Sequence, residues 1–214
     1  MRLGVFGGSF DPVHLGHLLL AEYCREAAGL DRVWFTPAAT PPHKKDRPLS
    51  DASHRVNMLR LAIGGHEAFE VCTDELERGG TSYTYQTLQQ LHRARPNDEL
   101  FLLIGGDSFE DLPRWREPAT VLSLAWPVVV GRVGSQVDWQ ILAPLVPAER
   151  LQAMPRFHVC MPAIELSSTE IRRRVQLGQS IRYQTPRAVE MYIRAAGLYQ
   201  DAPPAPPEMT DSLA

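Results

Sequence analysis

Short apolar runs recur along the chain, and most of them are apolar throughout instead of alternating with polar residues. A strand that is apolar on both faces is typical of a parallel sheet with helices packed on each side. The runs are LGVF near residue 4, RVWFTP near 33, FEVCTD near 70, LFLLIGG near 102, WPVVVG near 128 and FHVCMP near 159. They predict the strands of such a sheet.

Segments with the 3.6-residue period of a helix separate these runs. In the first segment, the apolar residues spaced to share one face are Leu15, Leu18, Leu19 and Tyr23, and Gly29 offers a C-terminal stop. A second segment, DASHRVNMLRLAIGG, also closes on glycine. This alternation predicts an α/β fold with a Rossmann-like, doubly wound, mostly parallel sheet. Helices are expected on both faces, and ligands beyond the carboxyl ends of the strands.

The pattern changes toward the C-terminus. Residues 1–165 carry the alternation of strand and helix, and they are predicted to form one core domain. Residues 166–198 are helical in pattern and are predicted to form a small C-terminal subdomain. Residues 199–214 hold four prolines and little apolar surface, which favours a disordered tail.

Charge and cysteine content narrow the class of protein. The 214 residues carry a formal net charge of -3, whereas a nucleic-acid partner would favour a strong basic excess. The three cysteines, Cys24, Cys72 and Cys160, form no C-x-x-C pair, so neither a disulfide framework nor a zinc site is predicted. No run reaches the ~18 apolar residues of a membrane helix, and no secretory signal is found, which favours the cytoplasm.

The first apolar run opens into GGSFDPVHLGH, where two histidines flank a glycine at the start of a helix. The glycines match neither G-x-G-x-x-G nor the P-loop pattern, so neither standard phosphate cradle applies. His14 and His17 project to the same side of the first helical turn, whose free N–H groups already favour an anion. With Gly16 leaving room for a ligand, the pair predicts a small cationic pocket for a phosphate in transfer.

A second helix start with similar chemistry lies near the C-terminus, in ELSSTEIRRRV. Ser167 or Ser168 can cap this helix, and Glu170 can complete a capping box. Ile171 lies on the apolar face of the same helix. Free N–H groups, hydroxyls and Arg172 are then expected to converge on a second anion site.

GGSFDPVHLGH followed much later by SSTEIR resembles the nucleotidyltransferase superfamily, whose motifs are (H/T)-x-G-H and I-S-S-T-x-x-R. The segments TPAATPPHK, SYTYQTL, IGGDSF and LPRWREP also match in order, which makes the chain similar to the bacterial nicotinate mononucleotide adenylyltransferases. The likeness covers residues 1 to about 198. Leu166 stands where the family usually has isoleucine, a change of shape more than of chemistry.

The resemblance implies transfer of the adenylyl group of ATP to nicotinate mononucleotide. The products would be nicotinate adenine dinucleotide (deamido-NAD) and pyrophosphate, in NAD biosynthesis. The acceptor phosphate is largely ionised at neutral pH, so this nucleophile needs no general base, and positioning with charge neutralisation is expected to supply catalysis. Mg²⁺ is expected to arrive with ATP, because the sequence holds no carboxylate cluster spaced for a dedicated metal site.

The resemblance also implies residue roles. The expected catalytic residues are His14 and His17, which stabilise charge on the α-phosphate and bridging oxygen, and Arg172, which holds the β and γ phosphates. The expected ATP-binding residues are Gly7, Gly8, Ser9, Phe10, His14, Gly16, His17, Gly105, Asp107, Ser167, Ser168, Thr169 and Arg172. The expected residues for nicotinate mononucleotide are Ser9, Phe10, His43, Lys44, Tyr83, Thr84, Asp107, Trp115 and Arg116.

Several of these residues also have structural interpretations. Asp107 and Glu110 form the D-x-x-E spacing of a capping pattern, and TPPHK could be an exposed basic loop. Tyr83 and Trp115 could stack on a pyridine ring or only pack, while Thr84 begins a helix whose N–H groups suit a carboxylate. Nicotinate is preferred over nicotinamide mostly on the resemblance.

Rival functions remain open at this point. Within the superfamily they are adenylyl transfer to nicotinamide mononucleotide or to phosphopantetheine, although the phosphopantetheine enzymes usually have threonine where His14 stands. From another class, a non-catalytic nucleotide-binding module is the alternative. The sequence allows a homo-oligomer and leaves the oligomeric state open.

Overall fold

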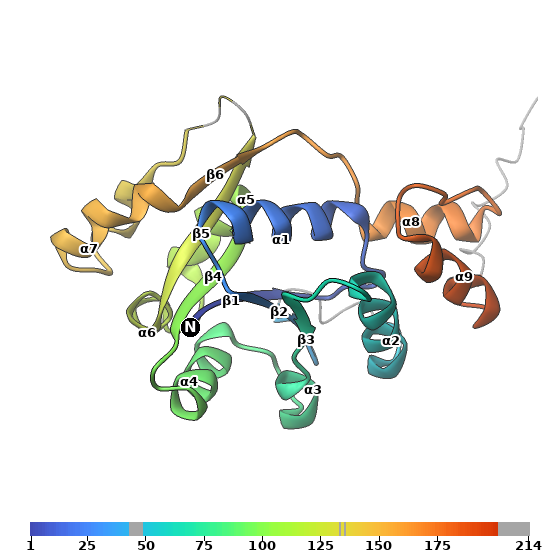
Figure 1. The fold of residues 1–214 in the computed structure, drawn as a ribbon, viewed down its shortest axis with the longest axis horizontal. Coiled ribbons are helices and arrows are strands. Elements are labelled where there is room, and N and C mark those ends of the chain that lie inside the picture. The colour runs from blue at the N-terminus through green and yellow to red at the C-terminus, as the bar shows by residue number, and fades with distance from the viewer. Residues whose placement is uncertain (43–48, 133, 135, 201–214) are drawn as a thin grey trace, which may run out of the picture.

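The computed structural model describes residues 1–42, 49–132, 134 and 136–200 (Figure 1). Within these residues the sheet is 6-stranded, in the order β3-β2-β1-β4-β5-β6, and every neighbouring pair is parallel. The strands are β1 (Arg2–Gly8), β2 (Arg32–Pro37), β3 (Phe69–Val71), β4 (Glu99–Gly105), β5 (Ala125–Arg132) and β6 (His158–Met161). Each coincides with one of the apolar runs, so the predicted parallel α/β sheet is confirmed.

The chain changes direction across the sheet after β3. It first adds β2 and β3 on one side of β1, and it then adds β4, β5 and β6 on the other. This order leaves a crevice at the carboxyl ends of β1 and β4, where the two halves diverge. Gly8 ends β1 and Gly105 ends β4, so both residues stand at this crevice.

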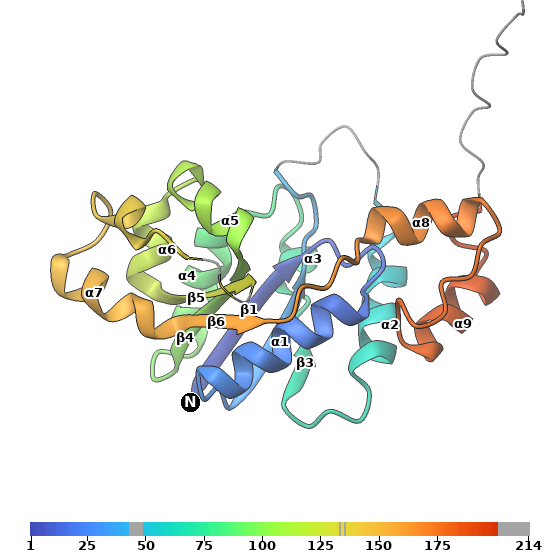
Figure 2. The same ribbon diagram turned by 90° about the horizontal axis from the view of Figure 1, so that it is seen from above.

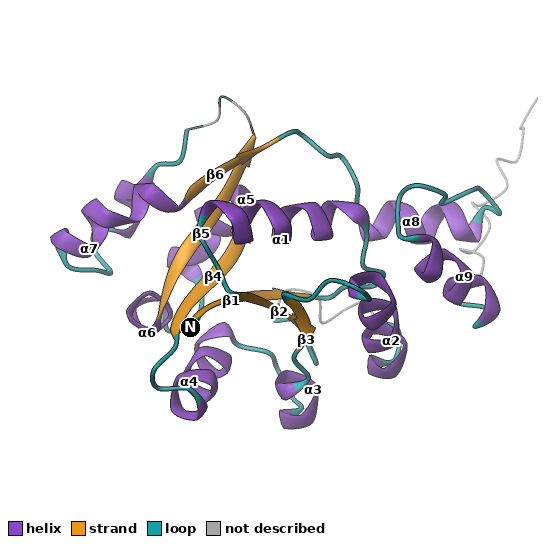
Figure 3. Ribbon diagram, viewed as in Figure 1, coloured by secondary structure: helices purple, strands orange, loops and turns teal. Residues whose placement is uncertain are grey.

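Helices cover both faces of the sheet (Figure 1, Figure 3). α1 (Leu15–Ala27) and α2 (Ala52–Ile63) bury side chains in one apolar cluster with Phe6, whereas α4 (Thr84–Ala94) and α6 (Pro118–Leu124) do so in another with Val5. Neighbouring residues of β1 therefore point into opposite cores. The other helical elements are α3 (Asp74–Arg78), α5 (Gly106–Asp111), η1 (Leu112–Arg114), η2 (Trp139–Leu142), α7 (Ala148–Ala153), η3 (Met154–Phe157), α8 (Ser168–Gln176) and α9 (Arg187–Ala195). Across the described part of the chain, no helix has the length and apolar character needed to cross a membrane.

The buried face of α1 differs from the predicted one. Ala21 and Cys24 are fully buried and Leu18 packs against the core, whereas Leu19 is 39% and Tyr23 is 36% exposed. Small side chains at the contact let the helix lie close to the sheet, so the larger ones fall on the outer side. The expectation that Leu19 and Tyr23 lie on the buried face is therefore wrong. It relies on the large apolar residues, whereas the small residues Ala21 and Cys24 are the ones that are fully buried.

The C-terminal helices share the core of the sheet. α9 packs on α2, and α8 lies beside them at the same end of the molecule (Figure 2). Ile171, Val189 and Ile193 are buried in the same cluster as Phe6, and Tyr199 packs against that cluster. A separate subdomain at residues 166–198 stays a prediction, and residues 201–214 of the predicted tail lie outside the described residues.

Candidate active site

The loop between β1 and α1 is bent at Phe10. This residue has a left-handed backbone with φ of 48°, it is only 1% exposed, and its ring lies edge-on to Phe6 with 5.4 Å between ring centroids. A Cβ on Gly8 would lie 2.9 Å from the Phe10 ring, so a side chain at residue 8 would collide with it. The Phe10 side chain thus belongs to the core, and the role of this residue in substrate binding stays a prediction.

The two histidine rings of the first motif stack at the start of α1. Their centroids are 3.6 Å apart and their planes differ by 25°. The backbone N–H of His14, the N-cap residue, donates to Nδ1 of His17 at 3.2 Å. Because Nδ1 of His17 accepts this bond, the proton of the neutral ring is on Nε2, which can donate to a ligand.

Gly16 makes room for the His14 ring. A Cβ at residue 16 would lie 3.1 Å from Nδ1 and Cε1 of that ring. The glycine therefore leaves space for a histidine of the site itself, and its role in leaving room for a ligand stays a prediction.

Burial keeps the His14 ring uncharged. His14 is 7% exposed, and desolvation lowers its pKa from 6.5 to about 4. At neutral pH the His14 ring therefore adds no positive charge to the predicted cationic pocket while no ligand is bound. A polyanion bound beside the ring would favour its protonated form and would raise this pKa.

We expect His14 to make the fold less stable in mild acid. The unfolded chain protonates this ring near pH 6.5 and the folded protein only near pH 4, so the unfolded state binds more protons between these values. This contribution to the free energy of unfolding is present above pH 6.5 and is lost as the pH falls through the window, by about 3 kcal/mol. Denaturant titrations at about pH 7, 5.5 and 4 would measure the loss, and His14→Gln should not show it. An equal decline in both proteins would contradict the expectation.

The second motif meets the loop from the C-terminal side. Ser167 caps α8, because its Oγ accepts from the Glu170 N–H at 3.1 Å. The Glu170 carboxylate accepts from Nε of Arg173 at 2.8 Å instead of returning to the cap, so the expected capping box is only half formed. Oγ of Ser168 donates to the Pro12 carbonyl at 2.8 Å, which ties the start of α8 to the first motif.

The side chain of Arg172, a residue of the second motif, reaches the loop of the first motif. Its Nη1 donates to the Asp11 carbonyl, and its Nη2 donates to Oγ1 of Thr169 at 3.0 Å. Its Nη1 also lies 4.0 Å from a carboxylate oxygen of Asp11, in a largely buried position. A cation is therefore fixed directly beside the loop that precedes His14.

These groups line one pocket of about 450 Å³, which we call the phosphate pocket. Hydroxyls, helix N-terminal N–H groups, imidazoles and a guanidinium gather there, and this is a donor set that suits phosphates. The structure thus brings together two motifs that are far apart in the sequence. The lining residues are Ser9, His14, His17, Leu49, Leu166, Ser167, Ser168, Thr169 and Arg172.

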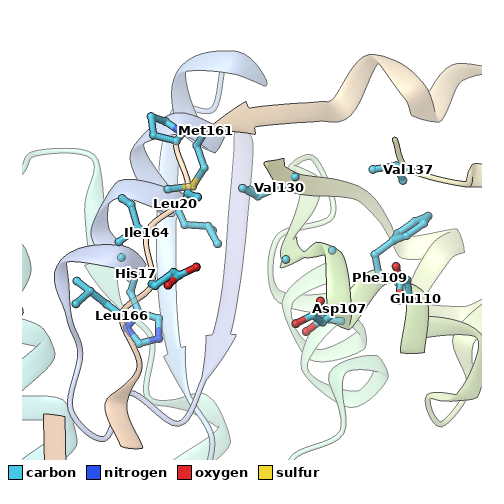
Figure 4. A pocket seen from close by; sticks show the side chains of 18 of the residues that line it. His17, Leu20, Asp107, Phe109, Glu110, Val130, Val137, Met161, Ile164 and Leu166 are labelled. Carbon is cyan, nitrogen blue, oxygen red and sulfur yellow. The ribbon is translucent and has the colours of Figure 1, made fainter. Parts of the chain in front are cut away.

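A second pocket of about 600 Å³, the strand-end pocket, is lined by both histidines. Figure 4 shows His17 at this pocket. An apolar wall comes from Met161, the last residue of β6, and from Ile164 in the linker that follows. Figure 4 shows Asp107 and Glu110 of α5 on the side opposite Ile164. Gly16 and Gly105 also line this pocket.

Asp107 does not cap α5. The N-cap residue is Gly105, and no side chain makes a capping bond to this helix. The D-x-x-E capping interpretation is therefore wrong. The exposed carboxylate of Asp107 instead lines the strand-end pocket (Figure 4).

A third pocket of about 660 Å³, the aromatic pocket, lies at the ends of β1 and β4. Thr84 begins α4, as predicted, and the Arg116 guanidinium lies 5.1 Å from the centroid of the Tyr83 ring. The pocket's lining includes Gly7, Gly8, Ser9, His17, Glu75, Ser82, Tyr83, Thr84, Gly105, Ser108, Trp115 and Arg116. Asp107 lines the strand-end pocket and not this one, and His43 and Lys44 lie outside the described residues.

His17 lines all three pockets, and Ser9, His14 and Gly105 each line two of them. The phosphate pocket therefore adjoins both larger pockets, and an imidazole stands where the three meet. This arrangement suits two ligands that occupy the two larger pockets and approach each other at a phosphate. Within the described ranges, no group of three or more His, Cys, Asp or Glu side chains is placed to hold a metal ion.

Comparison with known proteins identifies the family. A family model described as cytidylyltransferase-like matches residues 5–174. A protein of Thermomicrobium roseum is 44% identical over 209 residues, which cover 98% of this chain and 96% of the relative. A protein of Thermus thermophilus is 44% identical over 200 residues, which cover 94% of this chain and 100% of the relative. Both relatives are named probable nicotinate-nucleotide adenylyltransferase.

The chain belongs to the nicotinate-nucleotide adenylyltransferase family. A nicotinic acid mononucleotide adenylyltransferase of Plasmodium falciparum, solved in complex with NaAD, aligns with a TM-score of 0.72 at 20% identity, over 92% of this chain and 97% of its own. A putative nicotinate-nucleotide adenylyltransferase of Vibrio parahaemolyticus aligns with a TM-score of 0.67 at 18% identity, over 94% of this chain and 98% of its own. These likenesses confirm the Rossmann-like fold.

Some residues that line the pockets were not predicted from the sequence. Met161 ends β6 and Ile164 lies in the linker after it, so the rule that ligands lie beyond strand ends would have found them. Glu75 carries no such signal, because it reaches the aromatic pocket from the short helix α3. Its buried Oε1 accepts from Oγ1 of Thr87 at 2.6 Å. Glu75 thus brings a carboxylate into this pocket, whereas Glu117 of PRWREP does not line it.

Proposed function

We propose that the protein transfers the adenylyl group of ATP to nicotinate mononucleotide, forming nicotinate adenine dinucleotide and pyrophosphate in NAD biosynthesis. One observation carries the proposal: His17 lines the phosphate pocket and also both pockets that adjoin it. ATP and a mononucleotide each have a ring system at one end and phosphate at the other. Two such ligands, one from each side, would meet at His17 through their phosphates.

In this proposal the adenosine of ATP occupies the strand-end pocket. The apolar wall with Met161 and Ile164 suits an adenine ring, and the Asp107 carboxylate suits the hydroxyls of a ribose. The triphosphate then extends into the phosphate pocket, toward the N-terminus of α8 and Arg172. Mg²⁺ would enter as part of the ATP substrate.

Nicotinate mononucleotide is placed in the aromatic pocket. Trp115 and Tyr83 offer aromatic rings for the pyridine, and the N–H groups at the start of α4 suit its carboxylate. Arg116 adds a positive charge beside Tyr83. The phosphate of the acceptor would then lie toward Ser9 and His17, which this pocket shares with the phosphate pocket.

The proposed chemistry is a direct in-line displacement. An oxygen of the acceptor phosphate bonds to the α-phosphorus of ATP, the bond from that phosphorus to the bridging oxygen breaks, and pyrophosphate leaves with the electron pair. The nucleophile is already ionised near neutral pH, so no residue has to remove a proton. His17 would donate from Nε2 to the α-phosphate, and Arg172 would neutralise charge on the leaving pyrophosphate.

We expect nicotinate mononucleotide to be the preferred acceptor. Its carboxylate can accept from several N–H groups at the start of α4, whereas an amide brings its own N–H donors to that place. Initial rates of pyrophosphate release should give kcat/KM at least about tenfold higher for nicotinate than for nicotinamide mononucleotide, and none with phosphopantetheine. A preference for nicotinamide mononucleotide would overturn the choice of acceptor. Absence of pyrophosphate with every acceptor would favour the non-catalytic module.

Asp107→Asn and Trp115→Ala are expected to affect different substrates, because Asp107 lines the strand-end pocket and Trp115 the aromatic pocket. Asp107→Asn weakens the acceptor for ribose hydroxyls, so KM for ATP should rise about fivefold. Trp115→Ala removes an aromatic face, so KM for nicotinate mononucleotide should rise about tenfold. Two-substrate kinetics measures both values. The reverse assignment would show that the two ligands are placed the wrong way round.

A further inference from the structure

The loop that carries the first motif is held by residues from distant parts of the chain. Four of its backbone carbonyls, at residues 9, 11, 12 and 13, accept from side chains at least 46 positions away. Because these bonds come from outside the loop, its shape depends on the elements that supply them. The donors are Arg55 to Ser9, Arg172 to Asp11, Ser168 to Pro12 and Thr185 to Val13.

The backbone on both sides of His14 is tied to residues 184 and 185. Oγ1 of the buried Thr185 donates to the Val13 carbonyl at 2.8 Å. On the other side of His14, the Leu15 N–H donates to the Gln184 carbonyl at 3.0 Å. The peptide units that flank this histidine are therefore both fixed by one short segment that lies before α9.

A second tie reaches the same loop through Asp11. Its carboxylate is 2% exposed, and Oδ1 accepts from the Tyr199 hydroxyl at 2.5 Å while Oδ2 accepts from the Ser50 N–H at 3.2 Å. Burial and the neighbouring Asp11 charge raise the pKa of Tyr199, so its hydroxyl stays protonated and remains a donor. Arg172 donates to the backbone carbonyl of the same aspartate. Tyr199 thus holds a residue that also touches the cation of the phosphate pocket.

We infer that Thr185 and Tyr199 are positioning residues of the transfer reaction: they fix the loop that aims His14 and His17 into the phosphate pocket. Neither residue lines that pocket, so both act through the loop. The inference rests on the proposed function for its kinetic test. Small displacements of catalytic groups are costly in rate, so loosening the loop should reduce turnover more than substrate binding.

The tyrosine is tested by Tyr199→Phe, with Tyr192→Phe as the matched control. The Tyr192 hydroxyl lies 2.9 Å from Nδ1 of His54 and 3.1 Å from Nδ2 of Asn57, so it joins α9 to α2 and leaves the loop untouched. We expect Tyr199→Phe to lower kcat about tenfold and to change KM for nicotinate mononucleotide by less than about twofold. Tyr192→Phe should keep the kcat of the unmodified protein. Equal kcat values in the two variants would overturn the role of Tyr199.

The threonine is tested by Thr185→Val, with Thr36→Val as the control. Thr36 is also fully buried, but within the described structure its hydroxyl has no hydrogen-bond partner. Thr185→Val should lower kcat about tenfold, Thr185→Ser should restore most of it, and Thr36→Val should leave it unchanged. Failure of Thr185→Ser to restore turnover, or an equal loss in Thr36→Val, would overturn the role of the hydroxyl. Thermal unfolding shows that each variant is folded at the assay temperature.

A measurement without turnover separates this inference from the proposed function. NMR titration of the His14 ring reports how well the loop is closed, because burial holds its pKa near 4 in the intact protein. In Tyr199→Phe and Thr185→Val this pKa should rise toward 6.5, and in Tyr192→Phe and Thr36→Val it should not. If the unmodified protein made no product, the proposed function would fail, and this titration would still decide the inference. An unchanged His14 pKa in both test variants would overturn it.

Discussion

Replacing His17 by alanine is expected to lower kcat by about 10³-fold while the fold survives. His17 lines all three pockets, and its Nδ1 accepts from the His14 N–H, so Nε2 is the nitrogen that can donate to a phosphate. In the proposed mechanism, the alanine variant would lose this donor at the place where negative charge develops in the transition state. KM for either substrate should change far less than kcat, because the other residues that line the strand-end pocket and the aromatic pocket remain.

His92→Ala is the matched control for this prediction. His92 is exposed in the last turn of α4, and it lines none of the three pockets of the site. Steady-state kinetics at saturating ATP and nicotinate mononucleotide, together with thermal unfolding of both variants, provides the comparison. A kcat for His17→Ala within about tenfold of the unmodified value would remove His17 from the mechanism.

Arg172→Lys is expected to lower kcat/KM for ATP by about 10²-fold. The guanidinium binds the Asp11 carbonyl and the Thr169 hydroxyl through two different nitrogens while it lines the phosphate pocket. An ammonium group keeps the positive charge but has no planar fork, so it cannot hold the loop and contact a phosphate in the same way. The charge alone should therefore not rescue the reaction.

Arg173→Lys provides the control, because it makes the same exchange at the next residue of α8. The Arg173 side chain is 54% exposed and pairs with Glu170 on the helix surface. We expect it to leave kcat/KM for ATP within about twofold of the unmodified value. If the two lysine variants lost activity equally, the loss would come from the helix and not from the pocket.

The sheet could be predicted because its strands are uniformly apolar and are separated by helical periods. Parallel strands that are covered on both faces have uniformly apolar sequences, so they can be recognised without knowledge of the tertiary structure. The crevice at the ends of β1 and β4 then follows from the strand order of a doubly wound sheet. The two motifs were predicted to form anion sites, and the structure places their residues in one pocket.

Other features of the site depend on tertiary packing, and no local sequence pattern predicts them. The Phe10 ring sits in the core because its backbone is left-handed, and His14 is uncharged because neighbouring elements bury it. Glu75 enters the aromatic pocket from a helix with no motif, and the Tyr199 hydroxyl reaches Asp11 across 188 positions of sequence. Contacts of this kind are set by how whole elements pack, so residue pattern alone does not predict them.

The dependence of the first loop on late residues has a consequence for biosynthesis of the enzyme. A ribosome makes residues 9 to 13 long before it makes Ser168, Thr185 and Tyr199, which hold that loop in the finished protein. Because domains fold in stages as the chain emerges, the early strands can pair while the loop still lacks these partners. We therefore expect competence for the proposed reaction only after these late residues have been made, and a nascent chain stalled before Ser168 should be inert toward ATP.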